Sequence, residues 1–108
     1  MSDMLFIAGQ LAQDSSGNVI APNNPAKQAE YIFGYIEKLL NDAGMIFDNL
    51  VKLSIFTNNM DYFQKISAVR DSYCMKSKPA CTTIEIDHFK KEGCCVEIEA
   101  IAAKIAQT

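Results

Sequence analysis

The pattern of apolar and polar residues along the chain predicts short strands that alternate with two helices. An apolar run at Asp3–Ala8 and a second one at Val19-Ile20 are separated by a dense turn signal, Asp14–Asn18. Two apolar runs around such a turn are typical of a hairpin. We therefore expect the chain to begin with two paired strands.

The clearest helix signal follows this hairpin. Asn24 can accept hydrogen bonds from the free N–H groups of a first helical turn, and Pro25 suits the first helical position. Apolar residues then recur at helical spacing from Ala29 to Ala43 and form one stripe. Gly44 can supply the positive φ that ends a helix. The stripe predicts that this helix packs one face against a sheet.

The remaining chain predicts a strand, a helix and two further strands. Leu50–Thr57 is typical of a strand, and Asn58-Asn59 breaks it and can cap a second helix over Asp61–Met75. Cys81–Ile86 and Cys94–Ala103 predict the last two strands. A strand, helix and strand in succession usually form a right-handed crossover between parallel strands. We expect an α+β fold, with a mixed β-sheet and both helices on one face.

The other face of this sheet is expected to have no cover within the chain. In Leu50–Thr57, we expect Val51, Leu53 and Ile55 to share one face. The last strand places Val96, Ile98, Ala100 and Ala102 on one face, and Cys95, Glu97, Glu99, Ile101 and Ala103 on the other. An uncovered apolar face predicts self-association through the sheet. A carboxylate there needs water, a partner or a proton, so the two glutamates are candidates for a working site.

Length, charge and the start of the chain limit the class of protein. The 108 residues suit a single domain over 1–108. The formal net charge of −3 argues against general attraction to phosphate backbones, so no nucleic-acid partner is expected. The first residues lack the basic start of a signal peptide, and no window approaches the ~18 apolar residues that span a bilayer. We expect a cytoplasmic protein without a membrane segment.

The four cysteines, Cys74, Cys81, Cys94 and Cys95, are interpreted as thiols. Cytosolic cysteines stay reduced, which argues against disulfides. Adjacent residues of a strand point to opposite faces, so Cys94 and Cys95 cannot together hold one metal ion. The sequence contains no C-x-x-C pair, and its one histidine, His88, falls in a turn. No metal site is expected.

Several short motifs occur in a fixed order along the chain. They are Ala8-Gly9-Gln10, Ala43-Gly44, Asn49–Phe56, Met60 with Phe63, Pro79-Ala80 and the ending Val96–Ala102, which reads VEIEAIA. Their order resembles the reactive-intermediate deaminase family, which is also called the YjgF or RidA family and is often labelled endoribonuclease L-PSP. The resemblance covers nearly the whole chain, and its C-terminal motif is fairly specific.

The resemblance implies a fold, an assembly and an activity. The implied fold is a mixed sheet with two helices, similar to chorismate mutase of the bacterial type. The implied assembly is a homotrimer whose sheets form a central barrel, with clefts for small-molecule ligands between subunits. The implied activity is deaminase-type hydrolysis of reactive enamines and imines to 2-oxo acids and ammonia, with no cofactor and no metal.

Four positions of the resemblance form a candidate site. Glu97 matches the glutamate that positions the attacking water, and Gly9 matches backbone that lines the cleft. Deaminating members follow Pro-Ala with an arginine that anchors the substrate carboxylate, but this chain has Cys81 there, and Thr83 replaces a cysteine two residues later. Truncating such an arginine costs about 2–5 kcal/mol, and a thiol cannot replace it. We expect an altered substrate, or weak turnover of 2-iminobutanoate.

Plainer roles compete with these functional ones. Glu97 could instead be hydrated inside the barrel or paired with a lysine, and Glu99 is better explained as structural. Cys81 could be nucleophilic or redox-active, but a small buried thiol is the commoner case. Arg70, the one arginine, could supply an anchoring charge from the second helix, although a solvated side chain fits its position better. The alternative function is a non-catalytic ligand-binding trimer, or the ribonuclease and translation-inhibitor roles attached to the family's labels.

Overall fold

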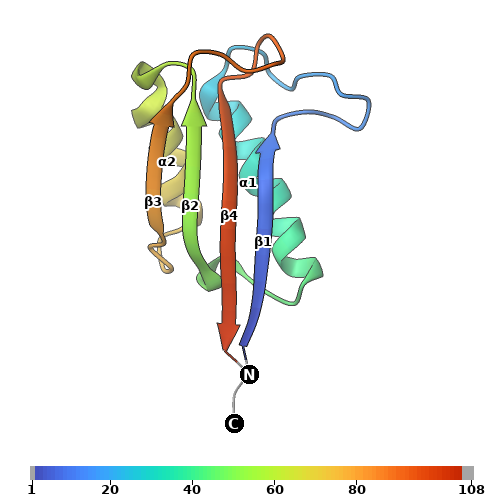
Figure 1. Ribbon diagram of the computed structural model, residues 1–108, viewed down its shortest axis with the longest axis vertical. Helices are drawn as coiled ribbons and strands as arrows, with labels where there is room; N and C mark the ends of the chain where they lie inside the picture. The colour runs from blue at the N-terminus through green and yellow to red at the C-terminus, as the bar shows by residue number, and fades with distance from the viewer. Residues whose placement is uncertain (1, 106–108) are drawn as a thin grey trace.

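The computed structural model describes residues 2–105, which form a four-stranded sheet and two helices (Figure 1). The strands are β1 (Ser2–Leu11), β2 (Leu50–Thr57), β3 (Ala80–Glu85) and β4 (Val96–Ile105), and the helices are α1 (Pro25–Asp42) and α2 (Phe63–Tyr73). Two short 3₁₀ turns, η1 (Phe47–Asn49) and η2 (Met60–Tyr62), precede β2 and α2.

The sheet is mixed, with the strand order β1-β4-β2-β3. β4 pairs antiparallel with both β1 and β2, whereas β2 and β3 run parallel and are joined through α2. Both helices lie behind the sheet in Figure 1, so they cover the same face. The predicted α+β architecture, with a mixed sheet and two helices on one face, is confirmed.

Local signals in the sequence set the ends of α1. The Asn24 side chain accepts a hydrogen bond from the backbone N–H of Lys27 at 3.1 Å, and Pro25 occupies the first turn. Gly44, with φ of 73°, follows the helix. The predicted stripe is buried at Ala29, Ile32, Phe33, Ile36 and Leu40, while Ala43 at the C-terminal cap is exposed.

Alternate residues of β4 form the centre of the core. Val96, Ile98, Ala100 and Ala102 are all buried against the helices, as the alternation predicts. A buried side chain the size of valine or isoleucine contributes about 1.5–3 kcal/mol relative to an exposed one. Hydrophobic burial on this face therefore fixes which residues of β4 point the other way.

The opposite face of the sheet, called the open face below, is uncovered within one chain. It carries the side chains of Met4, Phe6, Lys52, Ser54, Phe56, Thr82, Ile84, Glu97, Glu99 and Ile101, according to the strand register. Phe6 is 69% exposed and lies opposite Ile101. In residues 2–105, no helix has the length and apolar character needed to cross a membrane.

The predicted second strand of an N-terminal hairpin is wrong. Val19 forms only an isolated bridge with Gln13, and Ile20 belongs to no strand. The Asp14 carboxylate accepts hydrogen bonds from the backbone N–H groups of Ser16 and Asn18, both at 2.9 Å. These local bonds close a tight turn and favour a loop over an extended strand.

Two predicted face assignments are also wrong. Val51 is 46% exposed while Leu50 is buried, because the register of β2 against β4 shifts between Leu50 and Lys52. Cys95 precedes β4 and is buried, and its backbone N–H donates to Oε1 of Gln28 at 2.7 Å. Cys95 therefore does not belong to the open face.

Candidate functional site

Gly9 and Glu97 are in contact on the open face. In β1, Ile7 pairs with Ala100 and Gln10 pairs with Ile98, so Ala8 and Gly9 together lie opposite Glu99 in a β-bulge. A Cβ atom placed on Gly9 would stand 2.9 Å from Cδ and 3.0 Å from Oε2 of Glu97. The absence of a side chain at Gly9 thus leaves the space that the carboxylate occupies.

The environment of Glu97 favours its protonated form more than water does. Burial raises the pKa of the Glu97 carboxyl, and the nearby charge of Glu99 raises it further. Its side chain is half-buried, and no donor within residues 2–105 hydrogen-bonds to its carboxylate. A carboxylate with a raised pKa and free oxygens can orient a water molecule and accept its proton.

Apolar and polar groups surround this carboxylate on the open face. Leu11 and Phe56 pair with Glu97 from the two neighbouring strands. Next to it, a hollow of about 300 Å³ is lined by Phe6, Ile7, Ala8, Lys52, Ser54, Glu99, Ala100 and Ile101. In one chain, Glu99 lines this hollow and is exposed, whereas Glu97 beside it is half-buried.

Cys81 and Thr83 lie on the other side of the sheet. They pair in register with Leu53 and Ile55, whose side chains are buried against the helices. Cys81 packs against the core, and Thr83 is half-buried. Both side chains therefore face α2 from the edge strand β3.

Arg70 differs from the solvated side chain that its sequence position favours. Its side chain is 22% exposed, and Nη1 donates to Sγ of Cys81 at 3.6 Å. Nε donates to Oδ1 of Asp71 at 3.0 Å, and Nη2 lies 2.9 Å from the same oxygen. Sequence spacing gave no sign of the contact with Cys81, because it joins a helix to a strand.

The structure groups the four candidate residues into two pairs. Gly9 and Glu97 form the open-face pair, at β1 and β4. Cys81 and Thr83 face α2, and β2 lies between β3 and β4. Because the two pairs lie on opposite faces of the sheet, one chain does not bring all four residues together.

The other three cysteines are buried and free. Burial raises the pKa of Cys74 to about 11, and it also raises the pKa values of Cys94 and Cys95. These thiols therefore stay protonated at neutral pH. In the described range, 2–105, no cluster of three or more His, Cys, Asp or Glu side chains is placed to hold a metal ion.

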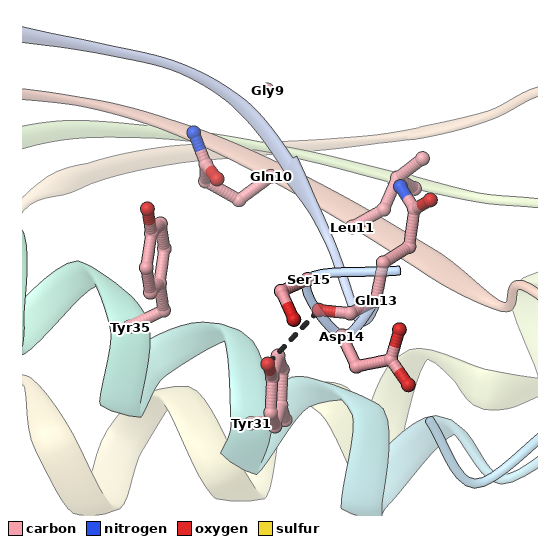
Figure 2. A pocket seen from close by; sticks show the side chains of 8 residues that line it. All are labelled: Gly9, Gln10, Leu11, Gln13, Asp14, Ser15, Tyr31 and Tyr35. Atoms are coloured by element: carbon pink, nitrogen blue, oxygen red, sulfur yellow. Dashed lines mark hydrogen bonds between the residues drawn. The ribbon is translucent and has the colours of Figure 1, made fainter. Parts of the chain in front are cut away.

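A hollow of about 400 Å³ lies between the end of β1 and α1 (Figure 2). It is lined by Gly9, Gln10, Leu11, Gln13, Asp14, Ser15, Tyr31 and Tyr35. The hydroxyl of Tyr31 donates to the backbone oxygen of Gln13 at 2.9 Å. Helical spacing explains the two tyrosines as packing or its margins, and in the structure both are exposed and stand into this space.

Comparison with known families and proteins finds relatives over nearly the whole chain. A model of the family described as Endoribonuclease L-PSP matches residues 1–104. A RutC family protein of Pyrococcus horikoshii is 31% identical over 102 residues, which cover 94% of this chain and 80% of that protein. The 2-iminobutanoate/2-iminopropanoate deaminase of Bos taurus is 31% identical over 100 residues, which cover 93% of this chain and 72% of the bovine protein.

Solved structures show the same fold. The crystal structure of a conserved Rid family protein from Yersinia pestis superposes with a TM-score of 0.84 at 30% identity. The superposition covers 92% of this chain and 79% of the Yersinia chain. The arrangement of two helices on a mixed sheet is thus shared with a solved protein of similar sequence.

Proposed function

Because the chain belongs to the Endoribonuclease L-PSP family, we propose that it hydrolyses small reactive imines or enamines to 2-oxo acids and ammonia. Support comes from the 2-iminobutanoate/2-iminopropanoate deaminases among its relatives. The observation that carries the proposal is the Glu97 carboxylate, which lies against Gly9 with no protein donor in residues 2–105 and with a raised pKa.

In the proposed reaction, Glu97 acts first as a base. Its carboxylate accepts a proton from water while the water oxygen bonds to the imine carbon, and the imine nitrogen takes a proton from solvent. The product is a carbinolamine. Glu97 then returns its proton to the nitrogen, the C–N bond breaks, ammonia leaves, and the hydroxyl proton passes to solvent as the carbonyl forms. The reaction consumes only water, so we propose no cofactor or metal.

The proposed cleft lies between two copies of the chain. The open-face pair and the residues that face α2 are on opposite sides of one sheet, so a neighbouring copy is needed to join them. The exposed apolar residues of the open face, such as Phe6 and Ile84, favour such an association. We propose a homotrimer with its sheets facing inward, similar to the assembly that the sequence resemblance implies.

The proposed rate is low because Cys81 leaves β3 without the arginine that deaminating members of the family carry at this position. A coupled assay tests the function directly: threonine dehydratase generates 2-iminobutanoate, and release of ammonia is followed with and without this protein. We expect slow acceleration by the unchanged protein and none by Glu97→Gln. Acceleration that survives Glu97→Gln would exclude the proposed role of Glu97.

A second candidate function is ligand binding without catalysis, and Cys81 at the anchoring position is the observation that favours it. Calorimetric titration with 2-oxobutanoate separates the two candidates. Binding without any acceleration in the coupled assay would favour the non-catalytic role, whereas acceleration that depends on Glu97 would exclude it.

A further inference from the structure

The one arginine of the chain is held beside the thiol of Cys81. Arg70 extends from α2 to β3, where Nη1 donates to Sγ at 3.6 Å. The arginine side chain is 22% exposed, while that of its carboxylate partner, Asp71, is 68% exposed. A guanidinium that is mostly removed from water, with its counter-ion in solvent, is well placed to take a further anion.

Other polar side chains extend along the same line between α2 and β3. At one end, Oε1 of Glu85 accepts from the backbone N–H of Met60, 2.7 Å away, just before α2 begins. At the other end, Arg70 meets Cys81. Thr83 lies between these two contacts, and its side chain is half-buried. α2 and β3 thus run in opposite directions, with Thr83 on the line between them.

A second hydroxyl comes from α2 itself. Ser67 precedes Arg70 by three residues, so the two lie on the same side of the helix. Its side chain is half-buried, like that of Thr83. Two half-buried hydroxyl side chains therefore accompany the guanidinium in this region, and such polar groups can fix the orientation of a small organic acid.

The hydrogen bonds of Arg70 leave capacity for a carboxylate. Asp71 uses one oxygen, Oδ1, on the Nε side of the guanidinium. The remaining contact within residues 2–105 is the sulfur of Cys81, which is a weak acceptor. A ligand carboxylate that replaces the sulfur would form two parallel, charge-assisted hydrogen bonds, a much stronger arrangement.

We infer that Arg70 binds the carboxylate of the substrate, and that Cys81 leaves the room for its guanidinium. This assignment rests on the proposed function for the identity of the substrate, a 2-imino acid. The anchoring charge comes from α2 instead of β3. Two arginines at positions 70 and 81 would repel each other. An arginine at position 70 is therefore compatible with a short, uncharged side chain at position 81.

Alkylation of Cys81 tests the assignment without any assay of activity. Iodoacetate carries a carboxylate and iodoacetamide does not, and both form an S–C bond while iodide leaves. Cys74, Cys94 and Cys95 are buried, so Cys81 is the thiol within reach, and mass spectrometry of its peptide gives both rates. We expect Arg70→Gln to lower the ratio of the iodoacetate rate to the iodoacetamide rate roughly tenfold.

The matched control, Lys65→Gln, removes an exposed charge from another side of α2 and should leave the ratio unchanged. An unchanged ratio in Arg70→Gln would overturn the inference.

Binding of 2-oxobutanoate, measured by calorimetry, gives the second test. Arg70→Gln should weaken binding roughly tenfold or more, and the double variant Arg70→Gln with Cys81→Arg should recover it. Normal binding by the Arg70→Gln variant would overturn this inference but leave the proposed function standing. If the unchanged protein binds no 2-oxo acid, the proposed substrate class is wrong, and the alkylation ratio then decides the role of Arg70.

Discussion

Gly9 borders the carboxylate of Glu97 so closely that a Cβ atom on Gly9 would stand 2.9 Å from Cδ of Glu97. Three atoms, Cγ, Cδ and Oε2 of the same glutamate, lie within 3.2 Å of that position. The contact involves the far end of a flexible side chain and not a backbone. A methyl group at position 9 would therefore move the carboxylate while the strands stay in place.

Gly9→Ala should lower kcat/KM for imine hydrolysis roughly 100-fold, because a misplacement of about 1 Å in a reacting group has an effect of that size. The free energy of unfolding should change by less than about 1 kcal/mol, because the Glu97 side chain can rotate away. The coupled assay and urea denaturation measure the two effects. A large loss of stability with no loss of activity per folded molecule would contradict this account.

Gly34→Ala is the matched control. Gly34 lies within α1, and a Cβ there would meet nothing within 4 Å. Alanine in a helix interior is favoured over glycine by about 0.5–1 kcal/mol, so this variant should be more stable. Its activity should equal that of the unchanged protein.

The raised pKa of Glu97 predicts a dependence of stability on pH. Burial, followed by the charge of Glu99, raises its pKa above the ordinary value of 4.5, so the folded chain holds this proton more tightly than the unfolded chain. Ionisation of Glu97 therefore costs stability, and the cost grows as pH rises from the unfolded pKa through the folded pKa. Glu97→Gln should be more stable than the unchanged protein at neutral pH, with the difference vanishing below pH 4.5. Urea denaturation of both proteins from below pH 4.5 to neutral pH measures this difference in the free energy of unfolding. A difference that does not depend on pH would contradict the raised pKa of Glu97.

The same carboxyl predicts the acid limb of the activity profile. The base form of Glu97 is required, so kcat/KM should rise with pH through a midpoint above 4.5. Glu99→Gln removes the second cause of the raised pKa and should move that midpoint to lower pH. If the midpoint does not move in Glu99→Gln, the charge of Glu99 does not affect the group that titrates in the activity profile.

The open face predicts the effect of a charge on assembly. Phe6 is 69% exposed and lies opposite Ile101, so Phe6→Lys places an ammonium among apolar side chains of the proposed interface. Light scattering should give a trimer for the unchanged protein and a monomer for Phe6→Lys. Ile46→Lys, at a 57% exposed residue before η1, is the matched control and should remain a trimer. If Phe6→Lys has the same mass as the trimer, or if the protein without substitutions is a monomer, the open face is excluded as the interface.

Local signals in the sequence predict much of the fold. Asn24 and Gly44 mark the ends of α1, the bounds of β2 agree with the sequence pattern, and alternation along β4 identifies the face that carries Glu97. Each of these features depends on residues close together in the chain. The face of Val51 was not predictable in this way, because the register shift depends on the partner strand.

The candidate site was predictable only in part for the same reason. Glu97 is identified from its own strand, but its contact with Gly9 depends on a bulge in β1. Arg70 meets Cys81 across the space between α2 and β3, and helical spacing does not say which strand lies beside a given residue. Contacts between elements are thus the part of the site that needed the structure.

Mixing of two impaired variants tests most directly whether the site is shared between copies. The variants Glu97→Gln and Arg70→Gln each lack one part of the proposed cleft. They are co-expressed with different tags, and trimers that carry both tags are purified. In each mixed trimer, whether 2:1 or 1:2, one of the three interfaces combines an intact Glu97 from one copy with an intact Arg70 from the next, so about a third of the unchanged protein's activity should return. Activity no higher than the sum of the two separate variants would contradict a site between subunits.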